Sequence, residues 1–389
     1  MPHIKVAPFD KDSIDNNPSL KDILLFRAND GYEELWGVAF EGEEFLLTLK
    51  SEDEGNYLIK YDKVTRPLKV DTLKNAIATF ADSLQLQILR SNIHSSKTKA
   101  PMASHYQKSI KDFEDIDFAG QKVSLEVGFG SGKHILHQAL KNPNKLYIGI
   151  EIHTPSAQQL LKQIKLQNIQ NIWVVNYDAR LLLEMIDSNT LDEIYVHFPV
   201  PWDKKPHRRV ISPSFLAQSM RALRVDGRLE LRTDSDKYFW YALETFFAHP
   251  KIDVQVHKNR ELEVVSKYEA RWRRQDKDIY DVYVKCQEES EAIVRNYSFD
   301  FKPLTLHSAL ASKLPKEPQI FEGYFVHFER IYKATHNALL LKVAFGSFDR
   351  PEHKFIYVSN LEIRYMPARP VATSANALAH QKIEEFLDV

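Results

Sequence analysis

A glutamate and three glycines form the pattern ExGxGxG at the end of an apolar run, with Glu126 two residues before Gly128 and with Gly130 and Gly132 after it. Glycines at a turn from strand to helix let the backbone approach a ligand closely. Alone, such a loop is a weak indicator. The dinucleotide fingerprint places its third glycine three residues after the second, and Lys133 stands there, so an NAD site is disfavoured.

Two further acids follow the next two apolar runs, Glu151 after the second and Asp178 after the third. The carboxyl ends of parallel strands meet at one crevice, where such sheets bind ligands. Glu126 can face the cationic amino-acid end of S-adenosylmethionine, Glu151 can accept from both ribose hydroxyls, and Asp178 can accept from an adenine amine. Singly each is an ordinary surface acid, but together with the glycines they predict a site for S-adenosylmethionine.

The stretch IYVHFPVPWDKKPHRR, residues 194–209, turns from an apolar run into a basic cluster. From Pro201 to Tyr280 there are 17 Lys and Arg against 12 Asp and Glu, whereas Met1 to Lys99 has 13 against 16. The cluster fits either a solvated loop or a phosphate-binding surface, and the local excess of positive charge favours RNA contact. Trp202 could stack on a base or plug the loop.

These segments resemble the bacterial tRNA (guanine-N7-)-methyltransferase family in content, order and spacing. The resemblance covers roughly Phe118 to Lys285 and rests on EVGFGSG, IGIEIHTPSAQQLL, NYDA, FPVPWDKKPHRR, RTDSDKY and SKYEARW. It implies a class I, Rossmann-like methyltransferase fold with a seven-stranded, mostly parallel sheet. The flanks, residues 1–99 and 290–389, lie outside it and look like atypical extensions.

The resemblance also implies roles for individual residues. Glu126, Glu151 and Asp178 would be cofactor ligands, in agreement with the reasoning above, together with Gly128 and Gly130. The substrate guanosine would be handled by Lys204, Asp234 and the run Ser266, Lys267, Tyr268 and Glu269.

Methylation of guanine N7 needs little from acid or base groups. N7 is an acceptor with a free lone pair and no proton to lose, so it can attack a sulfonium methyl group directly. The enzyme must align the reacting atoms, which supplies part of the ~7 to 11 kcal/mol that positioning can give. Asp234 and Glu269 are candidates for stabilising the ring as it becomes cationic, or for gripping its N1 and N2 donor edge.

Two positions depart from the family pattern. Val200 stands where the family has an aspartate, in PDPW, and Pro206 stands where an arginine is usual. Valine neither accepts a hydrogen bond nor carries charge, so no catalytic residue is assigned with certainty. The acid's role is either dispensable or taken by another carboxylate.

Two other classes of function compete with tRNA methylation. An amino-methyltransferase would place Asn or Asp before its Pro-Pro-aromatic corner, but Phe198 precedes Pro199 here. A non-catalytic or weakly active RNA-binding protein on the same fold is suggested by Val200. The intact acids Glu126, Glu151 and Asp178 count against it, because a protein without cofactor has no need of them together.

The surrounding pattern defines four regions: a β-rich accessory domain at 1–95, a linker at 96–117, the methyltransferase domain at 118–288 and a second β-rich domain at 289–389. From Lys122 onward strands alternate with helices, which predicts a mostly parallel α/β sheet. Thr154 and Pro155 predict the N-cap and first residue of a helix. Whether the two flanks pack together is left open.

Composition sets the remaining expectations. The chain has 389 residues, a formal net charge of -1 and one cysteine, Cys286, which excludes an intrachain disulfide and a cysteine-based zinc cluster. Cys286 and His197 lie in apolar strands and are predicted to be core residues. The sequence shows neither a signal peptide nor a membrane-length apolar run. We therefore expect a cytoplasmic protein without membrane association and without a metal. The resemblance implies tRNA as its partner, and a monomer is favoured, although the sequence leaves the oligomeric state open.

Overall fold

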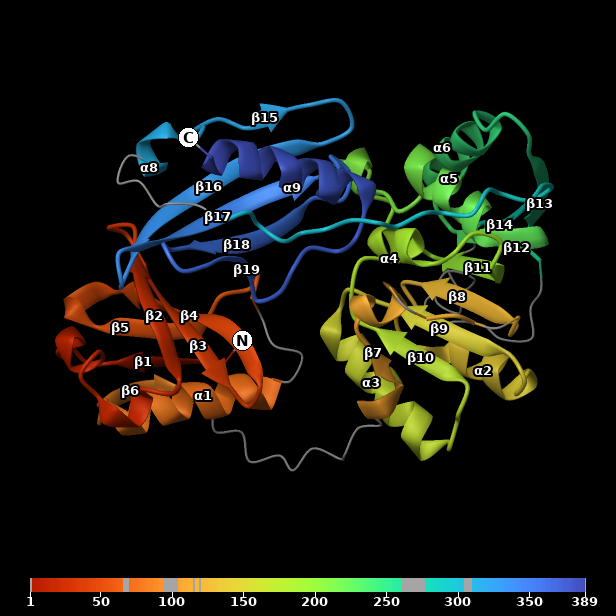
Figure 1. The fold of residues 1–389 in the computed structure, drawn as a ribbon. Coiled ribbons are helices and arrows are strands. Elements are labelled where there is room, and N and C mark those ends of the chain that lie inside the picture. The colour runs from red at the N-terminus through yellow and green to blue at the C-terminus, as the bar shows by residue number, and fades with distance from the viewer. Residues whose placement is uncertain are drawn as a thin grey trace. The chain divides into compact units, whose positions relative to one another are not determined.

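The computed structural model describes residues 2–65, 70–93, 104–114, 116–118, 120–260, 277–303 and 310–388. The chain divides into two compact units, shown in Figure 1. One comprises residues 99–296 with 371–373, and the other combines both flanks, residues 1–98, 297–370 and 374–389. Ser266, Lys267, Tyr268 and Glu269 lie outside the described residues.

The first unit is built on an eight-stranded sheet in the order β13-β14-β12-β11-β8-β9-β10-β7. Its strands are β7 (Gln107–Lys108), β8 (Val123–Val127), β9 (Leu146–Ile150), β10 (Ile172–Val175), β11 (Leu191–His197), β12 (Leu223–Thr233), β13 (Asp253–Lys258) and β14 (Tyr280–Lys285). β14 runs antiparallel to both its neighbours, whereas β7 to β12 pair in parallel. The mostly parallel α/β core predicted from the alternation is confirmed.

Helices cover both faces of this sheet, as two separate buried clusters show. Residues of α4 (Ala179–Met185), α5 (Pro213–Ala222) and α6 (Asp236–Phe247) join one cluster with β8, β9 and β11. Residues of α2 (Lys133–Lys141) and α3 (Thr154–Leu166) join the other with β9 and β10. Burial on both faces explains why β9 is apolar throughout rather than alternating, and why all five residues of β8 are buried, Ser124 and Glu126 included.

The structure corrects the sequence interpretation at three places. Residues 104–114, expected to be linker, contain β7 and two 3-10 turns, and Ile110 and Phe113 pack into the core. β7 adds an eighth strand because this two-residue segment pairs with the edge of β10. His153, not Thr154, is the N-cap of α3, since Thr154 already has helical geometry and its hydroxyl donates to Asn176.

The second unit contains strands from both ends of the chain in one 11-stranded sheet. The N-terminal flank supplies β1 (His3–Val6), β2 (Leu24–Asn29), β3 (Glu34–Phe40), β4 (Glu43–Ser51), β5 (Tyr57–Tyr61) and β6 (Ile88–Ser91), with α1 (Val70–Ser83). The C-terminal flank supplies β15 (Gln319–Ile320), β16 (Phe325–Ala334), β17 (Ala338–Gly346), β18 (Glu352–Val358) and β19 (Ile363–Met366), with α8 (Leu310–Lys313) and α9 (Ser374–Leu387). The two flanks therefore pack together in one sheet.

β2 and β16 join the two flanks. Asn29 pairs with Lys333 and Ala28 with Ala334 in antiparallel register. A buried cluster also mixes side chains from both, among them Phe26 from the N-terminal flank and Tyr357 from the C-terminal flank, whose rings stack 4.7 Å apart. The sequence places the flanks in two domains, but their strands and core are shared.

Candidate active site

The carboxyl ends of the parallel strands form one row across the sheet. Val127 at the end of β8 pairs with Ile150 of β9 and with Val196 of β11, and Ile150 pairs with Val175 of β10. Sequence neighbours β8 and β9 lie side by side, but β11 lies on the other side of β8. The strand order therefore reverses at β8, and such switch points are where open α/β sheets bind ligands.

The glycine loop connects β8 to α2 at this point. Gly128, Gly130 and Gly132 have φ of 70°, 53° and 72°, a region that disfavours any residue with a Cβ atom. A Cβ at Gly128 would meet no atom within 4 Å, whereas a Cβ at Gly132 would lie 2.8 Å from Leu160 Cδ1. Gly132 is therefore needed for packing as well as for its φ, and the space beside Gly128 is open.

Glu126 lies just before this loop and is 4% exposed. His134, in the first turn of α2, donates from Nδ1 to Glu126 Oε2 at 2.8 Å. A buried carboxylate needs a cationic or hydrogen-bonding partner, and His134 provides one. Sequence reasoning missed His134, although its place two residues after the glycine loop puts it in the helix that faces the end of β8.

A second histidine lies against the first. His197 is 4.5 Å from His134 between ring centres, and its Nε2 lies 3.0 Å from Glu230 Oε1. Burial lowers the pKa of His197, and the hydrogen bond to Glu230 only partly opposes it. Burial also acts to lower the pKa of His134, but the charge of Glu126 and the hydrogen bond to it outweigh burial and raise it. His197 is thus the hydrogen-bonded core histidine that the sequence predicts, and it also borders the cavity described below.

The other two proposed cofactor acids hold the chain in place. Glu151 accepts from the backbone N–H of Gly130 at 3.1 Å and of His153 at 2.9 Å, so it ties the glycine loop to the end of β9. Asp178 caps α4 by accepting from the backbone N–H of Arg180 at 2.9 Å, and the Arg180 side chain pairs with it at 2.7 Å. Both carboxylates therefore have fixed positions at the rim of the switch point.

β11 is followed by a corner, residues 198–209, whose backbone is strained at two residues. Phe198 and Trp202 have φ of 52° and 47°, where bulky side chains are rare and cost about 1 to 3 kcal/mol each. Arg209 is 8% exposed; its Nε donates to the Pro201 carbonyl at 2.8 Å, and its guanidinium lies 4.3 Å from the Tyr241 ring. Arg209 therefore fixes the corner from inside rather than meeting phosphate, which corrects its place in the predicted basic surface.

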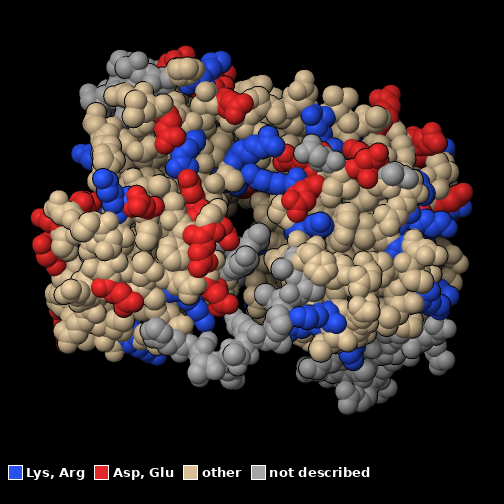
Figure 2. Space-filling model, turned by 60° about the horizontal axis from the view of Figure 1, so that its bottom comes forward, with Lys and Arg blue, Asp and Glu red and all other residues tan. Residues whose placement is uncertain are grey.

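The remaining basic residues of the corner lie at the surface. Lys204, Lys205, His207 and Arg208 are exposed, and the Arg208 guanidinium lies 5.2 Å from the Trp202 ring. On the face of the molecule seen in Figure 2, basic and acidic side chains are interspersed rather than gathered in one basic band.

A cavity of about 590 Å³ brings the glycine loop, the corner and the end of β12 together. Among the residues that line it are Glu126, Gly128, Gly130, Val200, Asp203 and Asp234. Its volume is in the range of small-molecule sites. Glu151, Asp178 and Lys204 are not among its lining residues, so the structure brings the predicted site residues together only in part.

S-adenosylmethionine fits the residues that are present. The buried Glu126 carboxylate at the cavity wall suits an ammonium group, and the open space beside Gly128 allows a ligand to approach the backbone. Glu151 and Asp178, at the ends of the neighbouring strands, carry the oxygen acceptors that would hold the ribose and the adenine. No group of three or more metal-ligating side chains occurs in the described part of the chain.

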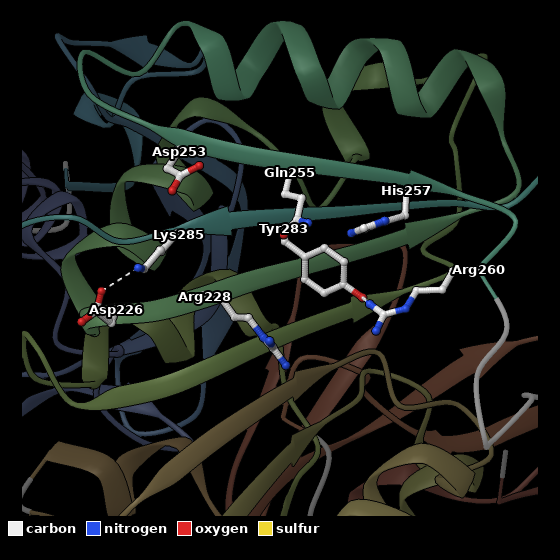
Figure 3. A pocket seen from close by; sticks show the side chains of 8 residues that line it. All are labelled: Asp226, Arg228, Asp253, Gln255, His257, Arg260, Tyr283 and Lys285. Atoms are coloured by element: carbon white, nitrogen blue, oxygen red, sulfur yellow. Dashed lines mark hydrogen bonds and ion pairs between the residues drawn. The ribbon is translucent and has the colours of Figure 1, made fainter.

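A second cavity, of about 540 Å³, lies on the face of β12, β13 and β14 (Figure 3). Its side chains mostly bind one another: Lys285 pairs with Asp226 at 2.7 Å, and Arg260 donates to the Tyr283 hydroxyl at 3.2 Å. None of the predicted cofactor or substrate residues lines it. The first cavity is therefore the candidate active site.

Known proteins resemble this chain over nearly its whole length. A family model described as "Putative methyltransferase" matches residues 120–282. The tRNA (guanine-N(7)-)-methyltransferase of Wolinella succinogenes is 39% identical over 383 residues, which cover 98% of this chain and 96% of that protein. Proteins of the same name are 36% identical in Campylobacter jejuni (98% and 95% covered) and 38% identical in Helicobacter acinonychis (90% and 87% covered).

Among solved structures, an antibiotic-related methyltransferase is 20% identical with a TM-score of 0.33, and the match covers 45% of this chain and 97% of that one.

The alignments with the three sequence relatives cover 90% to 98% of the chain. The two flanks, which lie outside the resemblance read from the motifs, are therefore not peculiar to this protein.

Proposed function

Because the chain belongs to the tRNA (guanine-N(7)-)-methyltransferase family, we propose that it methylates N7 of a guanosine in the variable loop of tRNA, with S-adenosylmethionine as methyl donor. The observation that carries the proposal is the shared cavity: the glycine loop and Glu126 line one wall, and the corner after β11 lines another. The methyl donor and the base can meet in one cavity of that size.

S-adenosylmethionine supplies, when bound, a methyl group made electrophilic by its sulfonium. The guanine N7 lone pair forms the new bond to carbon as the carbon–sulfur bond breaks, so no proton is removed. The chain's own contribution is then positioning. Glu126 holds the ammonium end, with His134 fixing the carboxylate, while Glu151 and Asp178 accept from the ribose and the adenine.

The substrate side of the cavity has complementary parts. Asp234 follows β12, lines the cavity and pairs with Lys277 at 2.9 Å. A carboxylate there can stabilise the positive charge that the guanine ring acquires. Lys204 is exposed on the corner, and we propose that it meets a tRNA phosphate. Ser266 to Glu269 are proposed as further substrate contacts on the resemblance alone.

The direct test is transfer of labelled methyl groups from S-adenosylmethionine to unmodified tRNA, with nucleoside digestion to identify the product. We expect 7-methylguanosine in the variable loop. Cofactor binding without any methylated nucleoside would favour an RNA-binding protein, and N6-methyladenosine would contradict the N7 assignment.

Lys204→Ala tests the substrate side separately. We expect weaker tRNA methylation, a salt dependence of tRNA binding shallower by about one unit of slope, and nearly unchanged cofactor affinity. Lys251→Ala is the control, since Lys251 is also exposed, lies in the same unit and pairs with Glu288. Equal loss of cofactor affinity in Lys204→Ala would refute the separation of roles.

A further inference from the structure

Three carboxylates line the candidate cavity within the described ranges: Glu126, Asp203 and Asp234. Glu126 is buried with His134 at 2.8 Å. Asp234 has a side chain 17% exposed, with Lys277 Nζ at 2.9 Å from Oδ2. The Asp203 side chain is 50% exposed, and Arg209 Nη2 lies farther away, at 3.6 Å from Oδ1. Asp203 is thus the most accessible of the three to a ligand entering from solvent.

The corner holds Asp203 in place although it is exposed. Arg209 is anchored by the Pro201 carbonyl and by the Tyr241 ring, so the guanidinium beside Asp203 is itself fixed. The neighbouring Trp202 has φ of 47°, and its carbonyl accepts from the backbone N–H of Lys205 at 2.8 Å. A binding group is effective when the groups around it prevent it from moving. Asp203 meets this condition.

We propose that Asp203 binds the guanine base by accepting hydrogen bonds from its N1–H and N2–H groups; this rests on the proposed function. Guanine presents two adjacent N–H donors on this edge, which the two oxygens of one carboxylate can accept together. Val200, three residues earlier in the chain and lining the same cavity, has a side chain with no acceptor. Asp203 therefore supplies, three residues later, the carboxylate that Val200 lacks.

The test combines a residue change with a change in the base. In a tRNA whose target guanosine is replaced by inosine, the N2 amine is missing but N7 and N1–H remain. We expect this replacement to lower kcat/KM of the unaltered protein by about tenfold, the usual effect of losing a hydrogen bond to a charged group. In Asp203→Asn and Asp203→Ala, methylation of guanosine should fall at least as far, because the carboxylate also accepts from N1–H, and inosine should lower it little further.

Asp187→Asn is the matched control, because Asp187 is an exposed acid that also pairs with a mostly buried arginine, Arg295 at 2.9 Å, away from the cavity. It should keep the full preference for guanosine. Cofactor affinity and thermal stability, measured on each variant, should stay near those of the unaltered protein. A role of Asp203 only in the fold of the corner would change these values and leave the preference intact.

The preference for guanosine over inosine decides the proposal. An unchanged preference in both Asp203 variants overturns it, and so does a loss of preference that appears in Asp234→Asn instead. Those results leave the proposed function standing if 7-methylguanosine still forms. If the unaltered protein forms no 7-methylguanosine, the proposed function fails and takes this inference with it.

Discussion

At the residue scale, His134 and His197 are two titratable groups in contact whose pKa values are shifted in opposite directions. His134 is raised by Glu126 against the effect of burial, and His197 is lowered by burial against the effect of Glu230. Glu126 thus favours the protonated form of His134, whereas burial favours the neutral form of His197. The charge of His134 also acts to lower the pKa of His197, because two cationic rings 4.5 Å apart would repel.

The first prediction concerns these two protonation equilibria. In imidazole NMR titrations, His134 should have its midpoint above 6.5 and His197 below it, 6.5 being the ordinary value. Glu126→Gln should lower the midpoint of His134, since it removes the charge that raises it. Glu193→Gln, on β11 and paired with Lys145, is the control that should leave it unchanged. A His134 midpoint below 6.5 in the unaltered protein would contradict the assignment.

The same shifts fix the sign of the effect on stability. The pKa of His134 is higher in the folded state than in the unfolded state. Its contribution to the free energy of unfolding is therefore fully present below the unfolded-state pKa and is lost as pH rises through the folded-state pKa. The contribution of His197, whose folded pKa is lowered, is present above the unfolded pKa and is lost as pH falls. The unfolding free energy of His134→Gln relative to the unaltered protein should therefore differ most at low pH.

A second prediction at this scale concerns Glu126 itself. Glu126→Gln keeps the shape of the side chain but removes its charge, so the affinity for S-adenosylmethionine should fall about 10- to 100-fold, the range for losing a charged hydrogen-bonding partner. Calorimetric titration measures it. The variant Glu193→Gln should bind normally, and an unaltered affinity in Glu126→Gln would remove Glu126 from the cofactor site.

At the element scale, the three loop glycines are not equivalent. Alanine at either Gly128 or Gly132 would be strained by the positive φ, but only at Gly132 would its Cβ meet Leu160, at 2.8 Å. Leu160 is fully buried in the core between α3 and the sheet. Gly132→Ala should therefore lower the unfolding free energy more than Gly128→Ala does, by about 1 to 3 kcal/mol.

Urea unfolding of the two variants side by side measures this difference, with each acting as control for the strain they share. Equal losses of stability would show that Leu160 moves aside without cost. Cofactor affinity should fall more in Gly128→Ala than in Gly132→Ala, because the open space that a ligand can enter lies beside Gly128.

The elements of the α/β core were largely predictable, whereas some contacts of the site were not. The apolar run of β9 and the ExGxGxG pattern after β8 made it possible to predict that Glu126, Glu151 and Asp178 lie at the ends of neighbouring strands. Their roles toward the cofactor stay predictions. His134 was missed because no local pattern shows that its ring meets Glu126. Arg209 was assigned to the surface because charge clustered in sequence does not reveal that one member is buried under Tyr241.

At the scale of the whole molecule, the flanks depend on each other. β2 of the N-terminal flank pairs with β16, and Phe26 stacks on Tyr357 in their shared core. The sequence indicated β-strands in both flanks. It could not indicate their pairing, because strand partners some 300 residues apart leave no signal in local periodicity.

No helix in the described part of the chain is long and apolar enough to cross a membrane.

The last prediction tests this dependence. Truncation after Asn296 removes β16 and leaves β2 with an unpaired edge and uncovered apolar side chains. In hydrogen-exchange mass spectrometry we expect β2 and β3 to lose protection, while β8 in the other unit keeps it. Full protection of β2 and β3 in the truncated chain would show that the N-terminal flank folds without its partner.

The shared sheet also sets an order of events during synthesis. β2 leaves the ribosome early, but its partner β16 begins only at Phe325, after residues 99–296 of the α/β unit have been made. At about 5 to 20 residues per second, β2 waits on the order of ten seconds to a minute for its partner. The enzyme's middle can therefore fold before its ends, and the N-terminal flank is the part for which a chaperone would matter most.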